Sequence, residues 1–236
     1  MPIEGIAFDL EGTVVDVEEA HHKGHLVTAR EFGVHIPPEE AFKKLPHFIG
    51  GPDRAVCEEI RSLMDPADAE GVTVDEILDR DRFHYDRLLQ SMPIELRPGF
   101  VDFYEAAKAM GLPMTIGSLT EEAQARKLLE GSRLVHLLGE ENIVLREHVQ
   151  EVKPAPDVFW ETARRMTIDP KSQVVFEDSP RGVTAAKRAG SLAVGMPVII
   201  KGETIASLVD AGASQIFFDW RVIDAKRLVS VLNEKP

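Results

Sequence analysis

The chain has 236 residues, of which 44% are hydrophobic and 28% are charged. These values are ordinary for a folded globular protein and exclude a disordered chain. The 40 acidic and 27 basic residues give a net charge of −13. Because this charge repels phosphate backbones and anionic lipid surfaces, we expect neither nucleic acid nor a membrane as a partner.

Cys57 is the only cysteine, so an internal disulfide is excluded and a reducing compartment is indicated. Its apolar neighbours on a predicted helix favour a buried structural thiol over a reactive one. The sequence shows neither a signal peptide nor a membrane-spanning run, and no feature requires more than one subunit. We therefore expect a cytoplasmic monomer.

Residues 3–8 form a short apolar run that predicts a buried strand ending at Asp9. The segment that follows has a different pattern, with successive helical patches and no convincing strand. These patches cover residues 21–32, 38–45, 54–64 and 74–89. We therefore predict a core domain of residues 1–16 and 94–236, interrupted after its first strand by a helical cap domain of residues 17–93.

Beyond residue 98 the pattern alternates between helices and strands. The predicted helices are residues 100–110, 121–129, 157–166, 180–189, 204–211 and 222–232, and the predicted strands are residues 113–117, 143–145, 173–176, 192–194 and 215–218. Strands that alternate with helices at these lengths indicate right-handed crossovers and a parallel sheet. The predicted fold class is α/β, with helices on both faces of the sheet and an inserted all-helical cap.

Two aspartates follow predicted strands of this sheet. Asp9 precedes Gly12 and Thr13, a tight turn whose backbone N–H groups suit an anion, although a lone aspartate is more often solvated or a helix cap. A carboxylate there can attack phosphorus and form an aspartyl-phosphate. Asp178, after the strand at 173–176, can supply a second oxygen ligand to Mg²⁺. The pair predicts a magnesium-dependent phosphoryl transfer site.

Two further side chains lie where strands or loops would reach the same edge. Ser118 follows the strand at 113–117; it can cap the next helix, with Glu121 completing a capping box, or hold a phosphoryl oxygen. Lys153 precedes Pro154 at the start of a predicted helix. A lysine is usually a solvated charge, but this one can place a cation against a phosphate.

These segments together resemble a known family. The motifs are Asp-x-acid-Gly-Thr at 9–13, the strand-end Ser118, Lys-Pro-x-Pro-Asp-x-Phe at 153–159, and Glu-Asp-Ser-Pro-x-Gly-Val-x-Ala-Ala-x-x-Ala-Gly at 177–190. In this order they resemble the haloacid dehalogenase-like hydrolase superfamily, in particular its β-phosphoglucomutase-like branch with a helical cap after the first strand. The resemblance implies a Rossmann-like three-layer core.

The resemblance also implies a role for each matched residue. Asp9 would be the nucleophile and Glu11 the acid and base. The cofactor Mg²⁺ would be held by Asp9, Asp178 and the backbone carbonyl of Glu11, with Glu177 as a ligand or a supporting group. Phosphate would be bound by Thr13, Ser118 and Lys153.

The predicted cap carries two further candidate substrate contacts. The segment Gly50-Gly51-Pro52-Asp53-Arg54 resembles a Gly-x-x-x-Arg segment that contacts substrate in the family. The guanidinium of Arg54 can form two parallel hydrogen bonds with a distal phosphate or carboxylate. His21 and His25 either face the site or are exposed on their helix.

Glu11 departs from the family, which has aspartate at this position. Its carboxyl lies one methylene further out, and a displacement near 1 Å can cost on the order of a hundredfold in rate. The predicted function is a phosphatase of small phosphorylated metabolites such as sugar phosphates, either adapted to Glu11, slowed by it, or left with a long-lived phosphoenzyme. The alternatives are a phosphosugar mutase and a phosphometabolite-binding protein without turnover.

Overall fold

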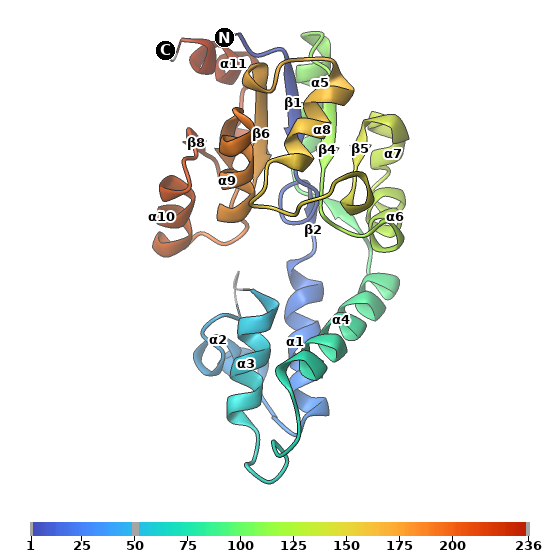
Figure 1. The fold of residues 1–236 in the computed structure, drawn as a ribbon, viewed down its shortest axis with the longest axis vertical. Coiled ribbons are helices and arrows are strands. Elements are labelled where there is room, and N and C mark those ends of the chain that lie inside the picture. The colour runs from blue at the N-terminus through green and yellow to red at the C-terminus, as the bar shows by residue number, and fades with distance from the viewer. Residues whose placement is uncertain (1, 49–51, 235–236) are drawn as a thin grey trace. The chain divides into compact units, whose positions relative to one another are not determined.

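The computed structural model describes residues 2–48 and 52–234 (Figure 1). The chain divides into two compact units: a core unit of Met1–Asp16 and Ile94–Pro236, and a helical unit of Val17–Pro93. Among the described residues, no helix is both long enough and apolar enough to cross a membrane.

The core unit is built on a six-stranded sheet in the order β5-β4-β1-β6-β7-β8, in which each pair of neighbours is parallel. Its strands are β1 (Gly5–Phe8), β4 (Met114–Gly117), β5 (Ile143–Val144), β6 (Gln173–Glu177), β7 (Leu192–Gly195) and β8 (Gln215–Ile216). Every residue of β1, β4 and β6 is buried, as strands covered on both faces require. The α/β class and the parallel, Rossmann-like core are confirmed.

Helices pack on both faces of this sheet (Figure 1). The helices of the core unit are α5 (Phe100–Ala109), α6 (Glu122–Gly131), α7 (Leu134–Leu138), α8 (Asp157–Met166), α9 (Pro180–Ala189), α10 (Gly202–Asp210) and α11 (Ala225–Asn233). Helices α8 and α9 pack on the face that presents Ala7 and Val175. The opposite face presents Phe8 and Phe176, whose rings pack with Trp220 at centroid distances of 5.8 and 4.8 Å.

The order of the strands indicates which edge of the sheet carries the candidate catalytic residues. From β1 the chain crosses to β4 and β5 on one side and then returns to β6 on the other. The register pairs Phe8 with Ile116 of β4 and with Phe176 of β6, so these three strands end side by side. Ligands of open parallel sheets bind at the carboxyl ends of strands where the order reverses in this way.

A two-stranded antiparallel ladder was not predicted. It joins β2 (Val15–Asp16) to β3 (Glu95–Leu96), pairing Val15 with Leu96. Arg97 donates its backbone N–H to the carbonyl of Val14 at 2.8 Å and continues the ladder. Strands of two residues are too short for an alternation of apolar and polar side chains to be recognised.

The helical unit contains α1 (Glu18–Glu31), α2 (Ala41–Lys44), α3 (Asp53–Leu63) and α4 (Val74–Ser91). Ala29, Ile60 and Ile77, on α1, α3 and α4, belong to a core of its own. Cys57 lies fully buried in this core, where burial is the main cause that raises the pKa of its thiol to about 12. Gly50 and Gly51 of the predicted substrate-contacting segment lie outside the described residues.

Candidate active site

Asp9 is the first residue after β1 and is 8% exposed. Its backbone N–H donates to the carbonyl of Phe176 at 2.9 Å, so its backbone stays paired to β6 although the strand has ended. Burial is the largest influence on the carboxyl and raises its pKa to about 7, with Glu177 and Glu11 adding to the rise and Lys153 opposing it. A carboxylate at this place is held rigidly and is poorly solvated.

Lys153 is the buried cation beside this carboxylate. Its Nζ lies 2.5 Å from Oδ1 of Asp9, 2.6 Å from Oε1 of Glu177 and 3.2 Å from the carbonyl of Gly117. Burial alone would lower the pKa of its ammonium, but the two carboxylates raise it above the ordinary value. The ammonium is therefore fixed in its charged form between the ends of β1, β4 and β6.

Glu177, the last residue of β6, is 1% exposed, and both of its carboxylate oxygens have partners. Oε1 accepts from Lys153, while Oε2 accepts from the backbone N–H and the hydroxyl of Ser179 at 3.0 and 2.9 Å. Gly182 leaves the room that this carboxylate needs, since a Cβ there would lie 1.7 Å from Oε1. Glu177 connects Lys153 to the beginning of α9.

Asp178 completes a group of three carboxylates with Asp9 and Glu177 whose ligand atoms all lie within 4.8 Å of one another. Its Oδ1 lies 3.5 Å from the hydroxyl of Thr13. Gly12, at a φ of +77°, packs against it, and a Cβ there would lie 2.4 Å from Oδ2.

This carboxylate group fits a divalent cation. Burial, Glu177 and Asp9 together raise the pKa of Asp178 well above its ordinary value, against the opposing charge of Lys153. The ammonium of Lys153 thus faces the buried carboxylates of Asp9 and Glu177 and the half-buried carboxylate of Asp178, which leaves negative charge for a cation to neutralise. Carboxylate oxygens are hard ligands of the kind that Mg²⁺ prefers.

Glu11 is held by a residue that the sequence did not single out. Thr120 donates its hydroxyl to Oε1 of Glu11 at 2.5 Å, and the Thr120 hydroxyl lies 2.8 Å from that of Ser118. Ser118 does not cap the following helix: α6 begins at Glu122, and Ser118 Oγ accepts from the backbone N–H of Thr120 instead. The capping-box interpretation of Ser118 is therefore wrong, because the chain turns through Thr120 before the helix begins.

Arg97 and Trp220 fix the backbone of the turn after β1, and neither was predicted. The guanidinium of Arg97, 8% exposed, donates to the carbonyls of Gly12, Met196 and Phe218 at 2.7, 2.8 and 3.2 Å. The indole N–H of Trp220 donates to the carbonyl of Thr13 at 3.0 Å. The only sequence signal was an arginine next to Pro98-Gly99, and backbone acceptors leave no pattern in the sequence.

The candidate substrate contacts Arg54 and His21 belong to the helical unit and lie on α3 and α1. The guanidinium of Arg54 is half exposed and pairs with Asp75. The ring of His21 stacks on Tyr85 with centroids 4.0 Å apart. Their roles as substrate contacts stay predictions.

The sequence of this chain is similar to those of known proteins. The family model of the haloacid dehalogenase-like hydrolases matches residues 3–190. Fructose-1-phosphate phosphatase YqaB of Escherichia coli is 32% identical over 190 residues, which cover 80% of this chain and 94% of YqaB. Protein CbbY of Rhodobacter capsulatus is 26% identical over 227 residues, which cover 95% and 94% of the two chains.

Among solved structures, a conserved haloacid dehalogenase-like protein of Agrobacterium tumefaciens has the same fold. It superposes with a TM-score of 0.77 at 22% identity, covering 98% of this chain and 100% of the other.

Proposed function

This chain belongs to the haloacid dehalogenase-like hydrolases, as a phosphatase, and we propose that it hydrolyses the phosphate monoesters of small metabolites, with sugar phosphates as the substrate class. The observation that carries the proposal is the buried ammonium of Lys153 between Asp9 and Glu177 at the carboxyl ends of β1, β4 and β6. A cation in this position can offset the negative charge of a phosphoryl group that binds beside the carboxylate nucleophile. The sugar-phosphate class rests on the likeness to YqaB.

In the first step, a carboxylate oxygen of Asp9 attacks phosphorus and the bond from phosphorus to the ester oxygen breaks. Glu11 gives its proton to the departing oxygen, which leaves as the alcohol. The ammonium of Lys153 offsets the negative charge that gathers on the phosphoryl oxygens.

In the second step, Glu11, now ionised, takes a proton from a water molecule that attacks the aspartyl-phosphate. The bond from phosphorus to Asp9 breaks, inorganic phosphate leaves and Glu11 is again protonated. The hydrogen bond from Thr120 supports this role, since it fixes the longer arm of a glutamate at one oxygen. This contact favours a site adapted to Glu11.

Asp9, Asp178 and the backbone carbonyl of Glu11 are the proposed ligands of Mg²⁺. The metal would supply positive charge that lets two anions approach one another. Because both oxygens of Glu177 are already engaged by Lys153 and Ser179, we place Glu177 as the group that orients Lys153.

The test is a panel of sugar phosphates with Mg²⁺, in which released phosphate and isomerised substrate are measured together. We expect released phosphate with the parental protein and none with Asp9→Asn, which keeps the volume and deletes the nucleophile. An isomer formed from a sugar 1-phosphate and its bisphosphate, with no free phosphate, would establish the mutase instead. Binding without either product would indicate a protein without turnover.

A further inference from the structure

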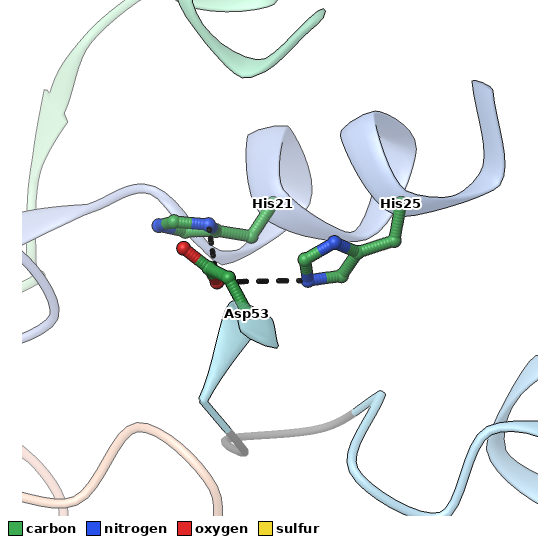
Figure 2. A group of neighbouring side chains, drawn as sticks. All are labelled: His21, His25 and Asp53. Atoms are coloured by element: carbon green, nitrogen blue, oxygen red, sulfur yellow. Dashed lines mark ion pairs between the residues drawn. The ribbon is translucent and has the colours of Figure 1, made fainter. Parts of the chain in front are cut away.

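A second group of metal-ligating side chains lies in the helical unit and plays no part in the chemistry above. His21, His25 and Asp53 place one ligand atom each within 4.8 Å of the others. Figure 2 shows both imidazoles on one side of α1, directed at the carboxylate of Asp53 on α3. Histidines four residues apart on a helix share a face, a spacing that lets both rings bind one ion.

The distances in this cluster are longer than hydrogen bonds and somewhat longer than the separations between ligands of one ion. Nδ1 of His21 lies 3.8 Å and Nε2 of His25 lies 4.0 Å from Oδ1 of Asp53. Both separations are too long for a hydrogen bond. Ligand atoms about 2.0 Å from a tetrahedral zinc are about 3.3 Å apart, so small side-chain rotations would close the set around an ion.

An independent observation concerns the other nitrogen of His25. Nδ1 lies 2.9 and 3.0 Å from the two carboxylate oxygens of Asp81, which also accepts from the hydroxyl of Thr28 at 3.0 Å. Asp81 and His25 are 2% and 3% exposed, so this pair is buried and its geometry is fixed. A carboxylate that holds one ring nitrogen in this way directs the other nitrogen outward as a metal ligand.

We propose that the helical unit binds one divalent transition metal, with Zn²⁺ as the best fit, through Nδ1 of His21, Nε2 of His25 and the carboxylate of Asp53. Two imidazoles with one carboxylate suit zinc better than Mg²⁺, which takes oxygen ligands. The side chains of His21 and Asp53 are 29% and 40% exposed, so an ion has access and a fourth position stays open to water or a ligand anion. Nε2 of His21 takes no part in the proposed coordination, so a substrate contact through that atom remains compatible.

The experiment titrates tag-free protein with Co²⁺, a spectroscopic substitute for zinc, in excess Mg²⁺ so that the carboxylate site of the core unit is filled. We expect one equivalent to bind with visible absorption of imidazole coordination and without a thiolate band, which excludes Cys57. Zn²⁺ should displace it. His21→Gln and Asp53→Asn should each weaken binding by at least about tenfold, and both side chains are exposed enough for replacement without loss of fold.

Two controls make the result specific. His22→Gln changes a neighbouring histidine on α1 that pairs with Glu18 at 3.0 Å, and Asp178→Asn weakens the core site; both should bind Co²⁺ as the parent does. Parental affinity in His21→Gln and Asp53→Asn, or no binding of Co²⁺ at all, would overturn the proposal. A stoichiometric ion lost in Asp178→Asn alone would also overturn it, since the ion would then belong to the core unit. Each of these outcomes is independent of whether the protein hydrolyses phosphate esters.

Discussion

Thr120 donates a hydrogen bond to Oε1 of Glu11 at 2.5 Å, although the two residues are 109 positions apart in the chain. This contact connects the segment after β4 to the turn after β1 and positions the carboxyl of Glu11.

We predict that Thr120→Val lowers turnover about tenfold to a hundredfold, because the carboxyl of Glu11 loses one hydrogen bond that positions it while the nucleophile stays in place. Thr120→Ser keeps the hydroxyl and should retain most of the activity. Steady-state rates of both variants on one sugar phosphate check this. Equal rates for Val and Ser at position 120 would show that the contact does not position Glu11.

Gly182→Ala should lower turnover indirectly, by displacing the carboxylate of Glu177. The new Cβ would lie 1.7 Å from Oε1 of Glu177. The Glu177 side chain would have to move, and its hydrogen bond with Lys153 would be lost. We expect a loss of turnover on the order of a hundredfold. Gly202→Ala is the matched control on another helix, since a Cβ there meets nothing within 4 Å, and it should behave as the parent does. Parental turnover of Gly182→Ala would contradict the role given to Glu177.

Arg97→Met should lower the free energy of unfolding by about 3 kcal/mol, because carbonyls of Gly12, Met196 and Phe218 lose a buried charged donor. Chemical denaturation monitored by circular dichroism measures this. Arg164→Met, which removes an exposed arginine paired with Glu161 on α8, is the control and should leave the midpoint unchanged. A midpoint for Arg97→Met equal to that of the control would mean that these hydrogen bonds do not stabilise the turn.

The sequence predicted those parts of the fold that carry a local signal. Helices α8 and α9 have the predicted bounds, because proline marks the start of each and Gly190 marks the end of α9. Helix α7 was missed because five residues are too few to show a helical period. The β2–β3 ladder was missed for the same reason, and its strands are distant in the chain.

The same distinction holds for the candidate site. Asp9 and Asp178 could be proposed because each follows a recognisable strand, and the parallel topology brings the ends of neighbouring strands together. Thr120, Arg97 and Trp220 could not, because their partners are a distant carboxylate or backbone carbonyls that no residue type identifies. The His25–Asp81 pair was likewise not visible, since it joins two helices whose packing the sequence does not specify.

Removal of divalent metal should abolish phosphate release, and Mg²⁺ should restore it. The carboxylates of Asp9, Glu177 and Asp178 outnumber the ammonium of Lys153, so we expect that a negatively charged phosphate binds beside them only when a divalent cation is also present. Asp178→Asn should raise the Mg²⁺ concentration for half-maximal activity by at least about tenfold. Asp210→Asn, an exposed acid on α10, is the control. Full activity in excess chelator, after the metal content has been measured as nil, would refute the magnesium requirement.

The central claim is that Asp9 carries the phosphoryl group and Glu11 moves the protons. Glu11→Gln keeps the nucleophile and removes the transferable proton, so an activated aryl phosphate should still phosphorylate Asp9, whereas hydrolysis of the phosphoenzyme should be slow. The most direct measurement is acid quenching of Glu11→Gln with an aryl phosphate and Mg²⁺, followed by mass spectrometry of the peptide that contains Asp9. We predict one phosphoryl group on Asp9, and none when Asp9→Asn is added. An unmodified Asp9 peptide, with aryl alcohol and phosphate released at the parental rate, would contradict the account.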